Sequence, residues 1–139
     1  FEGGFKEAFG FEFKTMNYKD RWELIAAHPD FFGSLERVSK GLVTSFNNVY
    51  GARNVHILSS CPNNGFERYC IQKRDWVRQN VPELGGLVLF SRGGTRKAAF
   101  LQNKGDILID DTRENLAAWS VNGGNAVYFS CDEVLADEV

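Results

Sequence analysis

The sequence lacks several features that mark common functional classes. It contains no block of lysines or arginines, and a formal charge of −2 with a pI of about 5.7 disfavours a nucleic acid polymer as partner. The three cysteines form no Cys-x-x-Cys pair, which favours a reducing compartment over a disulfide scaffold. No apolar run approaches membrane-spanning length, and no signal peptide is recognisable. The two histidines lie far apart, so zinc is disfavoured. We therefore expect a cytoplasmic protein without a membrane partner.

The composition indicates one compact domain. Of the 139 residues, 43% are hydrophobic, which is enough for one core but not for two. Phenylalanine occurs 12 times, and most of these rings are expected to pack in the core rather than to line a pocket. No internal repeat or linker interrupts the chain, so residues 1–139 are predicted to form a single domain.

Short apolar runs alternate with helical patterns along most of the chain. Helices are predicted over residues 18–27, 34–50, 67–80, 96–101 and 114–121, the second of them capped by Ser34 and ended by Gly51. Strands are predicted over residues 54–58, 87–90, 106–109 and 126–129. Short apolar strands without strict alternation are typical of burial on both faces. They predict an α/β fold in which a three-layer parallel sheet is flanked by helices.

In a parallel sheet of this kind, functional side chains gather where the strands end. The residues after the first three predicted strands include Ser59, Ser60, Arg92, Lys97, Asp110 and Asp111. Serine hydroxyls can bind phosphate oxygens, and arginine or lysine can neutralise a phosphate dianion. By residue type alone, an ordinary turn is the commoner role for the serines, and a solvated surface position is commoner for the cations.

The acid pair Asp110–Asp111 is the strongest local signal. An apolar strand that ends in two adjacent acids is unusual, because neighbouring carboxylates raise each other's pKa unless a cation or donors compensate. Mg²⁺ prefers one or two carboxylates together with water and phosphate oxygens. A helix N-cap at Asp111 or Thr112 is the alternative interpretation, and the two roles are compatible.

In this order the pieces resemble the haloacid dehalogenase superfamily, and within it the 5'(3')-deoxyribonucleotidase family with its phage and bacterial relatives. The segment GDILIDDTRENLAAWSVNGGNAVYF, residues 105–129, is similar to that family's run of late strand, Ile-Asp-Asp, Asn, Trp, Gly-Gly and final strand. ILSSCP, residues 57–62, resembles its strand followed by Ser-Ser and Pro, with Cys61 as a departure. KRDWV, residues 73–77, resembles its Lys-x-x-Trp-Val helix, and FEGGF, residues 1–5, resembles the segment directly after its Asp-x-Asp-Gly-Val loop.

The resemblance implies a Rossmann-type core over about residues 34–139 and a small helical cap over about residues 1–33. It implies Mg²⁺-dependent hydrolysis of (deoxy)nucleoside monophosphates to nucleoside and phosphate through an aspartyl-phosphate. It also implies catalytic roles for Ser59, Lys97 and Asp111, Mg²⁺ coordination by Asp110, and substrate contacts by Phe1, Ser60 and Arg92. Lys104 competes with Lys97 for the role of phosphate-binding lysine.

The family's first strand has no counterpart in the sequence, which contains no Asp-x-Asp-Gly motif. We therefore expect this chain to lack the nucleophile and to self-associate through exposed sheet, which leaves a homodimer open. The main alternative is a non-catalytic relative that binds phosphate or a nucleotide. A signalling receiver domain is disfavoured, because its acid pair follows the first strand whereas Asp110 follows a late one. If the protein is viral, the host cytoplasm is its expected location.

Overall fold

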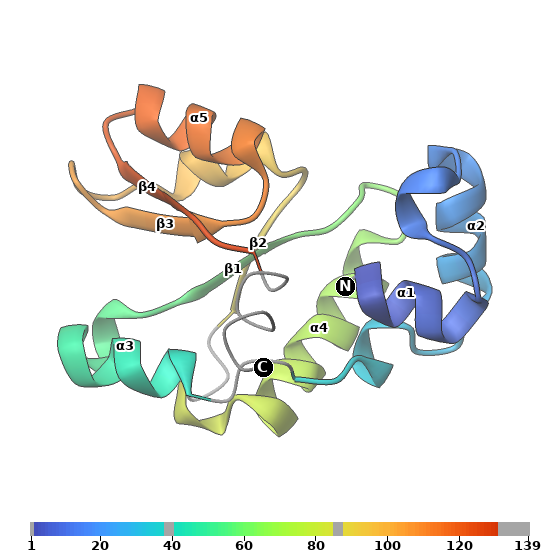
Figure 1. The fold of residues 1–139 in the computed structure, drawn as a ribbon. Coiled ribbons are helices and arrows are strands. Elements are labelled where there is room, and N and C mark those ends of the chain that lie inside the picture. Colours follow the sequence, from blue (N-terminus) through green and yellow to red (C-terminus); the bar gives the residue numbers. More distant parts are fainter. Residues whose placement is uncertain (1, 38–40, 85–87, 131–139) are drawn as a thin grey trace.

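The computed structural model describes residues 2–37, 41–84 and 88–130. The described residues up to Asn54 form helices only, and helices and strands alternate from Ile57 to Tyr128 (Figure 1). In chain order the elements, with η denoting a 3-10 helix, are α1 (Glu2–Phe9), η1 (Phe13–Thr15), α2 (Tyr18–Ala27), η2 (Phe32–Ser34), α3 (Leu42–Tyr50), η3 (Ala52–Asn54), β1 (Ile57–Ser60), α4 (Phe66–Asn80), η4 (Pro82–Leu84), β2 (Val88–Ser91), η5 (Thr95–Phe100), β3 (Ile107–Asp110), α5 (Arg113–Val121) and β4 (Asn125–Tyr128).

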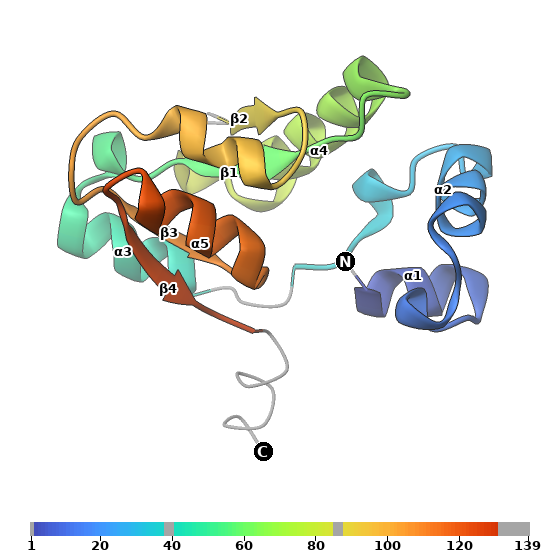
Figure 2. The ribbon, with the colours of Figure 1, turned by 90° about the horizontal axis from the view of Figure 1, so that it is seen from above.

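The N-terminal helices enclose a core of aromatic rings. Figures 1 and 2 show α1 and α2 at one end of the molecule, away from β3 and β4. Phe5, Ile25 and Phe31 are completely buried in this part. Phe9 stacks on Phe31 with ring centroids 5.6 Å apart, a separation at which aromatic pairs attract each other. Packing is therefore the role of Phe5, Phe9 and Phe31 in the described structure.

All four predicted strands are present, within three residues of their predicted bounds. β1 pairs in parallel with β2, with Ser59 opposite Phe90. β3 pairs in parallel with β4, with Asp110 opposite Tyr128. The prediction of a mixed α/β fold with parallel strands is confirmed. Among the described residues, however, the strands form two separate two-stranded sheets rather than one three-layer sheet.

The two strand pairs lie next to each other. Leu58 of β1 packs against a buried cluster of Leu108 from β3 and Leu116 and Trp119 from α5. β1 and β3 run in the same general direction (Figure 1). Their carboxyl ends therefore point to the same side of the molecule.

The helix predicted over residues 34–50 is wrong in its first part. The backbone is extended at Leu35, with a ψ of 142°, and α3 begins only at Leu42. The reason is a tertiary contact: the indole Nε1 of Trp76 on α4 donates to the carbonyl oxygen of Leu35 over 2.6 Å. Ser34 ends η2 instead of capping a long helix. Helical spacing along the chain does not reveal such a competing bond.

Candidate functional site

Lys97 and Asp110 form a buried ion pair at the end of β3. The Nζ atom of Lys97 lies 2.6 Å from Oδ2 of Asp110. The two side chains are only 12% and 5% exposed, so water and salt screen this pair weakly. η5 carries Lys97 to the strand end, while Lys104 is exposed to solvent. Lys97, rather than Lys104, is therefore the lysine that meets the acid.

Further hydrogen bonds fix the Asp110 carboxylate. The backbone N–H of Thr112 donates to Oδ1 over 2.8 Å, and Nδ2 of Asn115 lies 3.4 Å from Oδ1 and 3.3 Å from Oδ2. Burial alone would raise the pKa of Asp110. The bonds from Lys97, Thr112 and Asn115 outweigh burial and hold this pKa below its ordinary value. The carboxylate is therefore ionised at neutral pH.

Asn115 was not among the predicted site residues. It lies five residues after Asp110, on the first turn of α5, and is 7% exposed. It fits there because residue 94 is glycine: a Cβ atom on Gly94 would lie 2.4 Å from Oδ1 of Asn115. One sequence signal could have identified Asn115: it is a polar residue in the first turn of the helix that follows an acidic strand end.

A second cluster lies at the end of β1. The Nζ atom of Lys73, on α4, lies 3.1 Å from Oγ of Ser59 and 2.7 Å from the carbonyl oxygen of Ser60. The same ammonium group is 4.4 Å from the centroid of the Phe32 ring. Burial lowers the pKa of Lys73, and the positive charge of Lys97 lowers it further. Lys73 was not among the predicted site residues, and the structure brings it to the serines.

The two clusters lie close to each other, and we call them together the strand-end site: Ser59, Lys73, Lys97 and Asp110. Lys97 is close enough for its charge to lower the pKa of Lys73, and η5 packs against β1. The site combines two ammonium groups with one ionised carboxylate and one hydroxyl. Two ammonium groups in a poorly hydrated place favour a phosphate group, because charge-assisted bonds to phosphate oxygens are strong there.

A cavity of about 220 Å³ opens beside the Lys97–Asp110 pair, and its lining residues are Lys97, Ile109, Asp110, Asp111 and Phe129. Asp111 is exposed and reaches this cavity from the solvent side. Mg²⁺ is commonly held by one or two carboxylates, with water and phosphate completing its shell. Asp110 and Asp111 fit such a partial shell. Across the described ranges, no group of three or more His, Cys, Asp or Glu side chains could hold a metal, so they offer no closed protein cage.

The predicted substrate contacts Arg92 and Ser60 lie outside the lining of the cavity beside Asp110. Arg92 is exposed, and its guanidinium lies 3.9 Å from the centroid of the Phe66 ring and 3.5 Å from Oδ1 of Asn63. It does not line the cavity beside Asp110. Ser60 contributes its backbone carbonyl to Lys73. Phe1 lies outside the described residues.

Comparisons with known proteins assign no family. No protein-family model matches the chain, and no significant match was found among curated proteins or solved structures. The resemblance to the nucleotidases therefore stays a prediction from the motifs. Within the described ranges, no helix combines the length and the apolar composition that crossing a membrane requires.

Proposed function

We propose that this chain forms the phosphate- and Mg²⁺-binding part of a cytoplasmic phosphomonoesterase of the haloacid dehalogenase type, acting on (deoxy)nucleoside monophosphates. The observation that carries the proposal is the strand-end site. Ser59 with Lys73 lies at the end of β1, and Lys97 with Asp110 lies at the end of β3. Hydroxyl, ammonium and carboxylate groups at neighbouring strand ends are the groups that phosphoryl transfer requires for positioning and charge neutralisation.

The hydrogen bonds within the site suit a phosphate ligand. Because Lys73 donates to Oγ of Ser59, the hydroxyl hydrogen of Ser59 is directed elsewhere and can be donated to a phosphate oxygen. An ammonium group has three N–H donors, and the bond from Lys97 to Asp110 uses one of them. Lys97 can therefore hold Asp110 and a phosphate oxygen at once.

Asp110 and Asp111 would hold the metal in this proposal. Bound Mg²⁺ supplies neutralising charge to the phosphate oxygens. The bond from Lys97 keeps the pKa of Asp110 low, so that this carboxylate is ionised and able to bind a cation at neutral pH. Asp111, exposed at the rim of the same cavity, supports that role with a second negative charge.

The proposed nucleophile is supplied from outside these 139 residues, since they contain no Asp-x-Asp-Gly motif. Among the described residues, β1 and β3 are each paired along one edge only. A parallel strand between them would join the pairs into one sheet in the order β2-β1-strand-β3-β4. Such a strand would end between Ser59 and Asp110, and an aspartate just beyond its end would face the phosphate site.

Adding the strand tests the proposal. A version extended before Phe1 by an Asp-x-Asp-Gly-Val-bearing strand should hydrolyse deoxyuridine monophosphate with Mg²⁺, while the 139-residue chain should show negligible turnover. In the extended protein Asp110→Asn should abolish hydrolysis, and Lys104→Met should leave it unchanged. Turnover by the unextended chain would refute the proposed mechanism.

The absence of a nucleophile motif in this sequence also favours a second candidate, a non-catalytic binder of phosphate or nucleotide. The extended protein separates the two. Binding of deoxyuridine monophosphate without hydrolysis would establish the binder, whereas failure to bind either this nucleotide or inorganic phosphate would exclude both.

A further inference from the structure

Two buried thiols lie against each other beside the strand-end site. The Sγ atom of Cys70 is 3.7 Å from Sγ of Cys61, close enough for a weak S–H···S hydrogen bond. Cys61 directly follows β1, where its N–H donates to the carbonyl oxygen of Ser91 over 3.0 Å. Cys70 lies in the first half of α4. The loop after β1 thus carries one sulfur, α4 carries the other, and the bond to Ser91 fixes the backbone at Cys61.

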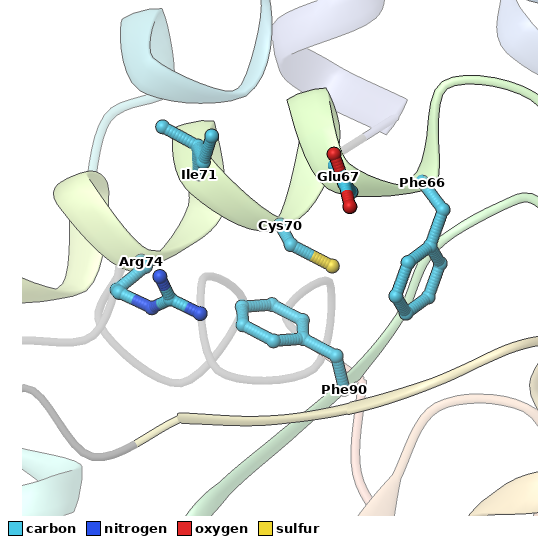
Figure 3. Close-up of a pocket in the computed structure, with 6 residues that line it drawn as sticks. All are labelled: Phe66, Glu67, Cys70, Ile71, Arg74 and Phe90. Atoms are coloured by element: carbon cyan, nitrogen blue, oxygen red, sulfur yellow. The ribbon is translucent and has the colours of Figure 1, made fainter.

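One of the two thiols has a route to solvent. Cys61 is 1% exposed and Cys70 is 6% exposed. Cys70 lines a cavity of about 320 Å³ between α4 and β2, whose lining residues are Phe66, Glu67, Cys70, Ile71, Arg74 and Phe90. Figure 3 shows the Cys70 sulfur pointing into this cavity, between the rings of Phe66 and Phe90. A small oxidant can therefore reach Cys70 before Cys61.

We propose that Cys61 and Cys70 form a redox-active dithiol that closes to a reversible disulfide when it meets a peroxide. In the first step the Cys70 sulfur attacks one oxygen of hydrogen peroxide, giving a sulfenic acid and one water. In the second step the Cys61 sulfur displaces the hydroxyl group of that sulfenic acid, so that the S–S bond forms and a second water leaves. The two thiols lose two hydrogen atoms and two electrons in total, and the peroxide takes up both.

The surroundings assign the order of these steps. Burial raises the pKa of the Cys61 thiol to about 12, so Cys61 is protonated at neutral pH and is not the first to react. The charge of Lys73 acts in the opposite direction and favours the thiolate that forms as the bond closes. The sulfurs need to approach from 3.7 Å to the roughly 2.05 Å of an S–S bond, and side-chain rotation can supply much of that movement.

The disulfide would join the loop after β1 to α4 near Lys73. Lys73 lies one turn beyond Cys70 on that helix, and Ser59 lies two residues before Cys61. A cytoplasmic disulfide is usually transient and redox-sensing, which agrees with the reducing compartment that the odd cysteine count favours. The inference does not depend on the proposed phosphatase activity.

Peptide mapping tests the pair directly. Trypsin cleaves after Arg53, Arg68 and Lys73, so Cys61 falls in peptide 54–68 and Cys70 in peptide 69–73. After treatment with hydrogen peroxide, the Cys131→Ser variant should yield these two peptides linked, with a mass two hydrogen atoms below their sum. Reduction with dithiothreitol should separate them. The oxidised variant should also melt about 5 to 10 °C higher than its reduced form.

Two control variants complete the experiment. Cys61→Ser and Cys70→Ser, each in the Cys131→Ser background, should give no linked peptides and no oxidant-dependent change in melting temperature. The wild-type chain should give the same linked pair, because Cys131 is not required for it. Sulfinic acid at Cys70 without linkage, or disulfide-linked dimers in place of the linked pair, would overturn the inference.

Discussion

Replacing Lys97 with methionine should destabilise the protein by about 3 kcal/mol at neutral pH, because it leaves the buried Asp110 carboxylate without its cation. The Lys97 and Asp110 side chains are 12% and 5% exposed, so solvent cannot take over the role of the ammonium group. Asp110 keeps its hydrogen bonds from Thr112 and Asn115. The expected loss of stability is therefore at the lower end of the range for removing one partner of a buried ion pair. At a urea m-value of about 2 kcal/mol per molar, the unfolding midpoint should fall by about 1.5 M.

The stability lost in Lys97→Met should become smaller as the pH falls. In the wild type the pKa of Asp110 is lowered from 3.8, so its contribution to stability is fully present above about pH 3.8 and is lost as the pH falls through the folded-state pKa. In Lys97→Met burial remains while the strongest opposing bond is gone, so the folded-state pKa of Asp110 rises. Protonation of Asp110 then relieves the destabilisation. The difference in unfolding free energy between the wild type and Lys97→Met should therefore become smaller from neutral pH toward about pH 4.

Urea unfolding of three variants provides the assay. Lys104→Met removes an exposed lysine nearby and should change stability by no more than about 0.5 kcal/mol. Adding Asp110→Asn to Lys97→Met should recover part of the loss, since no buried charge is then left unpaired. If Lys97→Met behaved like Lys104→Met, or if its loss did not vary with pH, the ion-pair argument would be refuted.

Two further predictions concern the surroundings of the pair. Gly94→Ala should destabilise the protein by about 1 to 3 kcal/mol in chemical denaturation, because its Cβ would lie 2.4 Å from Oδ1 of Asn115. Gly41→Ala is the control and should be nearly neutral, since its Cβ would meet no atom within 4 Å. Equal losses of stability in the two variants would contradict the packing described. The pKa of Lys73 is lowered from 10.5, so the wild type should gain stability relative to Lys73→Met as the pH rises from that lowered pKa toward about 10.5. Unfolding curves of both proteins at about pH 8 and pH 10 check this. The same difference in unfolding free energy at both pH values would count against a buried ammonium group.

The sequence predicts the strands and their ends well because each strand is a short apolar run closed by polar residues, such as Ile107–Asp110. It also predicts that Asp110 and Lys97 lie at one edge of a parallel sheet, since each follows a predicted strand, and in the structure Nζ of Lys97 lies 2.6 Å from Oδ2 of Asp110. The place of Lys73 was not predictable, because it depends on which face of α4 packs against β1. The extended backbone at Leu35 likewise depends on a partner on α4.

A titration with inorganic phosphate, followed by NMR at the lysine side-chain nitrogens, tests most directly whether the two strand ends form one phosphate site. We predict that the Nζ signals of Lys73 and Lys97 shift together with a single dissociation constant, while the signal of the exposed Lys104 stays in place. Ser59→Ala should weaken both shifts equally. Separate dissociation constants for Lys73 and Lys97, or shifts no larger than that of Lys104, would show that the two strand ends do not form one phosphate site.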